Sequence, residues 1–228
     1  MMMRKILAAV LLMSLALSSF GVLAEGQLTT TQKSLLEIDG EDKGYFFARV
    51  ENTGDAGLFV GSGKLVGFSA NDDILVSTDY VSSYPGGIQL APGEYAYVRE
   101  FLWESVLKDK DIADYKFSAE SSPYGTEAKK LSSDVNFEIG GVDSYNNFVY
   151  VTVTNDSPDI VYGLYVVAAL FDANKELIYV ESNSYDSLGL HPNSTVTLKL
   201  YVDNDLVKHY QAHDIKPTSA DAQVYIVD

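Results

Sequence analysis

The residues best suited to chemistry lie near the carboxyl end of the chain, in the run His209-Tyr210-Gln211-Ala212-His213-Asp214. If this run is helical, His209 and His213 lie one turn apart on one face, a spacing that suits zinc or nickel with Asp214 beside them. No Glu follows His209, so the metalloprotease motif is absent. The alternative is an exposed connecting turn with two polar histidines. The equivalent stretch of the repeat described below, 106–111, contains no histidine.

Tyrosines in polar loops form the second candidate group. The chain has 16 Tyr, many of which alternate with apolar residues as in a sheet core, whereas Tyr80, Tyr84, Tyr145, Tyr185 and Tyr210 fall in polar loops. Exposed tyrosine rings can stack on sugars or anchor a protein interface. The long loop 79–89, with Tyr84 beside Pro85-Gly86-Gly87, is the best candidate recognition surface. Ordinary loop packing is the alternative.

Other chemistry has weaker support. Acidic residues cluster in turns such as 39–42 and 203–205, but these match a calcium loop only in part, so turn chemistry and solubility are the alternative to calcium. The chain has no Cys, only three His and no Gly-x-Ser-x-Gly turn between a strand and a helix. We therefore expect no enzymatic activity and no cofactor.

The first 24 residues have the features of a secretory signal peptide. A basic start, Met1-Met2-Met3-Arg4-Lys5, precedes an apolar run over 6–17, and small residues end at Ala24. The apolar run is shorter than the ~20 residues that span a bilayer, which argues against a membrane anchor. Cleavage predicts a protein that is secreted, at the cell surface or periplasmic, with no stable membrane insertion. The absence of Cys favours a bacterial source and excludes disulfides.

The charge balance excludes some partners. The formal net charge is −16, and loss of Arg4 and Lys5 with the signal peptide leaves −18. Nucleic acid and anionic lipid both require a basic face, so neither is expected as a partner. The expected partner is a protein or a glycan at the cell surface.

The candidate residues are carried by two similar β-rich units. Asn155 falls on Asn52 with an offset of 103, and Leu190-His191-Pro192-Asn193 falls on Leu90-Ala91-Pro92-Gly93 with an offset of 100. Period-two alternation predicts the same inward faces in both units. The inward positions are Phe46, Ala48, Val50, Ala96 and Val98 in the first unit and Val149, Val151, Val153, Val196, Leu198 and Leu200 in the second. Glu100 aligns with Leu200 and breaks the pattern, because it puts a charged residue at an inward position.

The repeat predicts an all-β fold of two tandem immunoglobulin-like antiparallel β-sandwiches after a cleaved signal peptide. Helices long enough for parallel crossovers are missing from the pattern. We expect a signal peptide over 1–24, a loose lead-in over 25–32 and the first sandwich over 33–120. A linker rich in Ser, Pro and Gly follows over 121–133, and the second sandwich over 134–228.

The second unit resembles the FxLYD-type domains of bacterial exported proteins. Their pattern is a strand ending in Asn, an apolar strand ending in Leu-Tyr-Asp, and a late Leu-x-Pro-Gly turn. The matching stretches are Val151-Thr152-Val153-Thr154-Asn155, Ala168-Ala169-Leu170-Phe171-Asp172-Ala173-Asn174 and Leu190-His191-Pro192-Asn193. Ala168 and Phe171 depart from the aromatic positions of that pattern. The resemblance covers most of 134–228 and, more loosely, 33–120. It implies an immunoglobulin-like sandwich and, since the family has no known common activity, no functional residues.

Three hypotheses follow for function. The first is a non-catalytic exported or cell-surface protein that acts as an interaction or structural module. The second is a carbohydrate-binding protein that uses the loop tyrosines Tyr80, Tyr84 and Tyr185. The third is a calcium- or metal-tuned accessory protein, with His209, His213 and Asp214 as the candidate metal ligands.

Overall fold

A computed structural model describes residues 25–38, 40–41, 43–84 and 86–226. The predicted signal peptide, 1–24, lies outside the described residues. The strands of the first half are β1 (Leu28–Ile38), β2 (Lys43–Asn52), β3 (Leu58–Phe68), β4 (Ile74–Val81), β5 (Ser83–Tyr84), β6 (Gln89–Leu90), β7 (Tyr95–Leu102) and β8 (Asp114–Ser122), with a short helix α2 (Glu104–Leu107). The second half contains β9 (Lys129–Ile139), β10 (Asn147–Thr154), β11 (Leu164–Phe171), β12 (Leu177–Tyr185), β13 (Thr195–Tyr201) and β14 (Ser219–Ile226), with helix α3 (Asn204–Ala212).

The first sandwich packs two antiparallel sheets face to face. One sheet has the order β1-β2-β7-β5, and the other has β4-β3-β6 with β8 also paired to β3. The predicted inward residues of β2 and β7 are fully buried between these sheets: Phe46, Ala48, Val50, Ala96 and Val98. The all-β, antiparallel prediction is confirmed for this half.

The second sandwich is one continuous set of strands, β12-β11-β14-β9-β10-β13, that bends at β9. Residues 129–131 of β9 pair with β14, and residues 132–139 pair with β10. One strand therefore belongs to both layers of the sandwich. Burial alternates strictly along β10, with Val149, Val151 and Val153 inside, as the alternation predicted.

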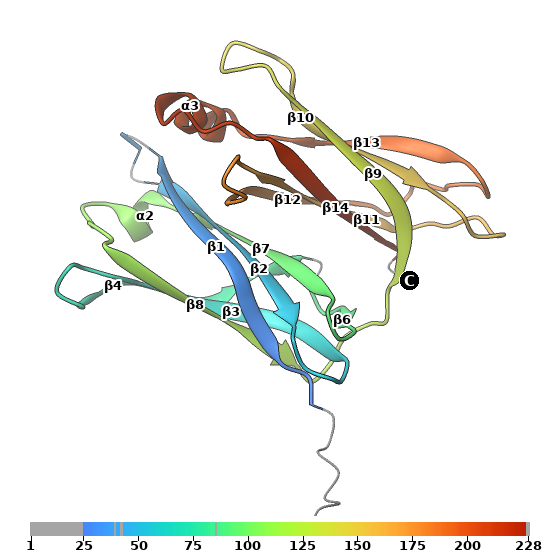
Figure 1. Ribbon diagram of the computed structural model, residues 1–228, viewed down its shortest axis with the longest axis horizontal. Helices are drawn as coiled ribbons and strands as arrows, with labels where there is room; N and C mark the ends of the chain where they lie inside the picture. Colours follow the sequence, from blue (N-terminus) through green and yellow to red (C-terminus); the bar gives the residue numbers. More distant parts are fainter. Residues whose placement is uncertain (1–24, 39, 42, 85, 227–228) are drawn as a thin grey trace, which may run out of the picture.

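The two sandwiches share a core. The sheet β1-β2-β7 lies between the β3–β8 layer and the second sandwich (Figure 1), and it contacts β12 directly. Tyr45, Phe47 and Tyr97 are buried on the side of this sheet that faces the second sandwich. Arg99 of β7 donates to Glu181 of β12 at 2.6 Å across the same boundary. The sheet β1-β2-β7 is thus covered on both faces, which the alternation along β2 did not predict.

Two segments predicted as irregular belong in part to strands, whereas 25–27 and 123–128 lie outside the strands as predicted. Part of the lead-in, 25–32, belongs to β1, whose first residues pair with the end of β2 from Leu28↔Asn52 onward. The predicted linker, 121–133, overlaps the end of β8, and β9 already begins at Lys129 rather than at Asp134. Polar composition suggested loops, but the strand parts of both segments have backbone partners in neighbouring strands. Such pairing tolerates polar residues on an exposed face.

The aligned asparagines occupy the same environment in both sandwiches. Both Asn52 and Asn155 have no exposed area. The side-chain amide of Asn52 donates to the carbonyls of Ala56 and Leu90, at 2.8 and 3.0 Å. The amide of Asn155 donates to those of Asp159 and Leu190, both at 2.8 Å. Each asparagine therefore ties the end of one strand to two turns of its own sandwich.

Glu100 breaks the repeat at a half-buried position of β7, and its replacement by leucine is expected to stabilise the protein. Phe46 faces Glu100 across β2 and β7, as Val149 faces the buried Leu200. Burial raises the pKa of the Glu100 carboxyl, and Arg99 offsets this in part. A leucine that fills the site should add about 1–2 kcal/mol of stability, or a rise in Tm of roughly 3–6 °C.

The gain should depend on pH. A raised folded-state pKa means that the protonated carboxyl favours the folded chain. This stabilisation is fully present below the unfolded-state pKa of about 4.3. It is lost as the pH rises through the folded-state pKa. The Tm difference between Glu100→Leu and wild type should therefore be larger at pH 7 than at pH 4. The exposed Glu127→Leu serves as control and should change stability by less than about 0.5 kcal/mol. An equal or larger gain at pH 4 would contradict the argument.

Candidate functional site

The predicted histidine pair lies on helix α3. Asp203 caps the helix, because its side chain accepts from the backbone N–H of Asp205 at 2.9 Å. His209 is 8% exposed and packs inside, so the alternative of an exposed connecting turn is wrong for this residue. The rings of His209 and His213 lie 4.3 Å apart between centroids.

Asp214 does not complete a metal site with these histidines. Its carboxylate is exposed and pairs with Lys216 at 2.7 Å, which lowers its pKa. Within the described ranges, no group of three or more His, Cys, Asp or Glu residues is placed to hold a metal ion. The same finding covers the acidic turns considered for calcium, as far as they are described.

The three candidate tyrosines come from separate elements. Tyr80 is 82% exposed on β4, whereas Tyr84 on β5 is half-buried and packs against the core shared by the two sandwiches. Burial raises the pKa of the Tyr84 hydroxyl. Tyr185 ends β12, and its hydroxyl donates to the carbonyl of Lys199 at 3.2 Å. No ring contact joins these tyrosines in the described part of the chain, so they do not form one platform.

An exposed aromatic surface occurs elsewhere, at the end of β7. Trp103, the only tryptophan of the chain, is 67% exposed. Its ring packs edge-on against Phe101 with centroids 4.4 Å apart, and Phe101 packs against Tyr45 at 5.0 Å. Trp103 therefore rests on a ring that is itself fixed to the core, although its own face is open to solvent.

Trp103 borders a hollow of about 460 Å³ that is also lined by Glu41, Lys43, Phe101 and Glu104. We call these five residues the Trp103 surface. A neighbouring hollow of about 470 Å³ shares Glu41 and Lys43 and adds further acidic residues. The added acidic residues are Glu37, Asp109 and Asp111, and they outnumber the one added cation, Lys110. The surroundings of the tryptophan are therefore both aromatic and acidic.

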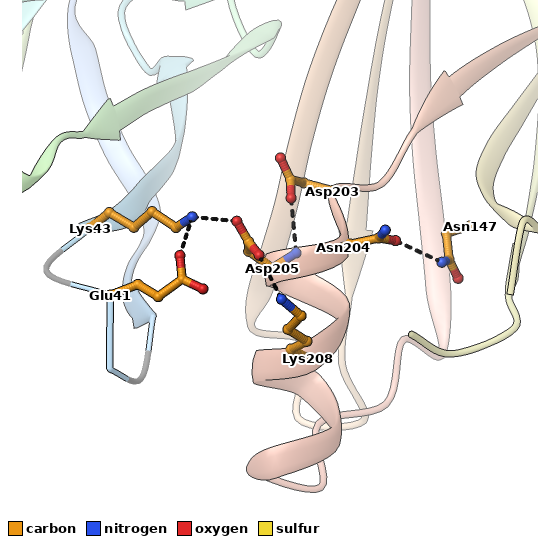
Figure 2. Close-up of polar contacts among 7 residues, drawn as sticks. All are labelled: Glu41, Lys43, Asn147, Asp203, Asn204, Asp205 and Lys208. Atoms are coloured by element: carbon orange, nitrogen blue, oxygen red, sulfur yellow. Dashed lines mark hydrogen bonds and ion pairs between the residues drawn. The ribbon is translucent and has the colours of Figure 1, made fainter. Parts of the chain in front are cut away.

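The side chain of Lys43 links the Trp103 surface to the second sandwich (Figure 2). Its ammonium pairs with the carboxylates of Glu41 and of Asp205, at the start of helix α3. The hydrogen bond from Lys43 lowers the pKa of Asp205, and Lys208 contributes at 3.3 Å. The positive end of the helix dipole favours the carboxylate at this position.

A second bond in the same view ties helix α3 to its own sandwich. Asn147, which is fully buried at the start of β10, donates to the side-chain oxygen of Asn204 at 3.3 Å. Lys43 of the Trp103 surface is thus bound to a helix that is itself fixed to the second sandwich.

Sequence reasoning did not select Trp103. The available signal was a single tryptophan inside a short polar connector, where a large apolar ring has little core to enter. For Tyr210 the error was the reverse, because a buried residue was expected to be exposed. It was assigned to a polar loop but is buried in the core, where its hydroxyl donates to the carbonyl of Ile178 at 2.7 Å.

Comparisons with known proteins give no family for the chain. No family model matches it, and no curated protein matches it. Among solved structures, the crystal structure of red sea bream transglutaminase is similar over 78% of this chain, with 12% identity and a TM-score of 0.28. The chain spans only 27% of the length of that transglutaminase chain, and a likeness at this level supports no argument about fold or function. No helix in the described ranges is long and apolar enough to cross a membrane.

Proposed function

We propose that this chain is an exported, non-catalytic interaction protein that binds a protein partner through the Trp103 surface. The observation that carries the proposal is the exposure of Trp103. Tryptophan is enriched among residues that dominate binding energy, particularly where neighbouring residues can exclude water from the contact. Phe101 supports the ring, and the hollow beside it can accept a side chain of the partner.

The charge of the surface restricts the partner. Glu41 and Glu104 lie beside the ring. Lys43 is shared between Glu41 and Asp205, and the exposed Lys108 pairs with Glu104 at 3.1 Å, so three carboxylates face two lysines. A cationic side chain can pack on the tryptophan face while it approaches these carboxylates. The proposed partner therefore presents a lysine or arginine, and its electrostatic attraction to this acidic chain weakens with salt.

The proposal of export rests on the signal-peptide pattern over 1–24. The proposal of a non-catalytic role rests on the missing Cys, the missing nucleophile motif and the resemblance of the second half to FxLYD-type domains. The carbohydrate and metal-tuned hypotheses are weaker proposals, because the three tyrosines are separate and Asp214 is engaged by Lys216.

The replacement Trp103→Ala is expected to weaken partner binding by at least about tenfold, as loss of a central aromatic anchor does. Immobilised wild type, Trp103→Ala and the control Tyr145→Ala would be exposed to extracellular proteins of the source culture. Tyr145 is 95% exposed on the second sandwich and lies outside the proposed surface. At least one protein should be retained by wild type and by Tyr145→Ala but not by Trp103→Ala.

Equal retention by all three proteins would contradict the proposal. A glycan array with wild type, Trp103→Ala and alanine variants of Tyr80, Tyr84 and Tyr185 separates the carbohydrate alternative, which predicts glycan binding that depends on one of these tyrosines rather than on Trp103.

A further inference from the structure

A separate hollow of about 300 Å³ lies between the two sandwiches. We call it the inter-sandwich hollow. Its walls come from β1, β2 and β7 on one side and from β11, β14 and the turn after β11 on the other. Hollows at the junction of two domains are common binding sites for small molecules, and this volume is near the lower limit of such sites.

Two strand irregularities meet at this hollow. The pairing of β1 with β2 shifts between Thr30 and Gln32, and this bulge brings Gln32 opposite Arg49. The pairing of β11 with β12 shifts at Phe171, which lines the other wall. Bulges often re-aim side chains at functional sites. Here Gln32 reaches across and donates to the carbonyl of Lys175 at 3.2 Å.

The floor of the hollow is a fixed polar arrangement. The hydroxyls of Tyr95 and Tyr97 both donate to the same carboxylate oxygen of Asp221, at 2.6 and 2.7 Å. Burial, followed by the bond to Asp221, raises the pKa of Tyr95 to about 12, so its hydroxyl keeps its proton at neutral pH. Two donors therefore offset the charge of Asp221.

Two buried polar atoms of this wall have no hydrogen-bond partner: the side-chain oxygen of Gln32 and the Nε of Arg49. A buried donor or acceptor without a partner costs about 1–3 kcal/mol. The rest of Arg49 is engaged, since its guanidinium lies 3.8 Å from the Tyr95 ring centroid and a terminal nitrogen lies 3.4 Å from Glu51. One acceptor and one donor from a ligand would satisfy both atoms.

The charges around the hollow favour an anion. Arg49 and Lys175 line it, and Lys130 approaches the Tyr95 ring at 5.7 Å. The facing carboxylates are Asp221, which accepts two tyrosine hydroxyls, and Glu51, which pairs with Arg49. This cationic surplus is local, because the whole chain carries a formal net charge of −16.

We propose that the inter-sandwich hollow binds a small carboxylic acid that also carries hydroxyl groups, of the size of one acidic sugar. Its carboxylate accepts from Arg49, a charge-assisted bond, and a hydroxyl donates to Gln32. Phe171 and the tyrosines offer apolar ring surface to the carbon skeleton. Because both unpaired atoms are shielded, binding requires the Gln32 side chain to turn away from Lys175.

Calorimetric titration of the full mature chain with D-galacturonate and D-glucuronate tests the proposal, with neutral D-galactose and D-glucose as matched controls. At least one acid should bind saturably with a Kd below about 1 mM, equivalent to about 4 kcal/mol, and the neutral sugars should bind at least tenfold more weakly. Arg49→Gln should weaken acid binding at least tenfold. Lys64→Gln, which removes only an exposed ion pair with Asp79, should leave it unchanged.

Gln32→Leu provides a second variant that keeps the arginine and should weaken binding several-fold, and circular dichroism would confirm that both variants fold. Absence of acid binding by wild type, or undiminished binding by Arg49→Gln, would overturn the proposal, as would equal binding of the neutral sugars. Trp103→Ala should bind the acids as wild type does. The outcome is therefore independent of the proposed protein-binding surface.

Discussion

Replacing Phe47 with alanine is expected to lower the free energy of unfolding by about 3–5 kcal/mol and to uncouple the two sandwiches. Phe47 has no exposed area and belongs to a core cluster made mostly of residues from the second sandwich. Its ring stacks against Tyr45 with centroids 6.0 Å apart. The cavity left by alanine therefore lies in the layer that joins the sandwiches. Calorimetry should show one transition for wild type and two for Phe47→Ala.

The adjacent residue is the matched control. Phe46 is equally buried on the same strand but faces the interior of the first sandwich. Phe46→Ala should cost a similar free energy by the same cavity argument, but it should destabilise the first sandwich without affecting the layer between the two. One transition for Phe47→Ala, or the same heat profile for both variants, would contradict a cooperative role for this layer.

The second large effect is expected for Asn155→Ala, which should destabilise the chain by about 2–4 kcal/mol and lower Tm by roughly 5–15 °C. The asparagine donates to two backbone carbonyls, and its oxygen accepts from the N–H and the hydroxyl of Ser157 at 3.0 and 2.7 Å. Alanine removes all four bonds from a site without solvent. Thermal and urea unfolding would measure the loss.

The repeat supplies an internal test of this prediction. Asn52→Ala should cause a loss of similar size, because Asn52 makes the corresponding bonds in the first sandwich. The exposed Asn183→Ala should change stability by less than about 0.5 kcal/mol. If Asn155→Ala behaved like Asn183→Ala, the bonds of the buried asparagine would have no net effect on folding.

Alternation in the sequence predicted buried residues correctly where a strand is covered on one face only. Where only one face of a strand is covered, as in β10, alternation placed Val149, Val151 and Val153 correctly in the core. Turn residues at fixed offsets also aligned Asn155 with Asn52, whose hydrogen bonds agree. These features are local, so a single sequence contains them.

Features that depend on contact between the sandwiches could not be predicted in this way. β2 is covered on both faces, and the unbroken apolar run Tyr45-Phe46-Phe47-Ala48 was the available signal for a doubly buried strand. The inter-sandwich hollow combines Gln32 and Arg49 with Asp221, residues far apart in the chain. The Trp103 surface likewise depends on Lys43 meeting Asp205 across the boundary. Neither spacing nor composition specifies such pairings.

The aromatic residues buried between the two sandwiches also determine whether the two halves of the chain can exist as separate proteins. If residues 25–122 were produced alone, Tyr45, Phe47 and Tyr97 would form an exposed apolar patch, which is an aggregation hazard. The second half alone would uncover Tyr225, which packs into the core of the first sandwich. Although the two halves repeat one plan, neither is a portable module. Domain exchange between such proteins should transfer both halves together, or first replace this layer with polar side chains.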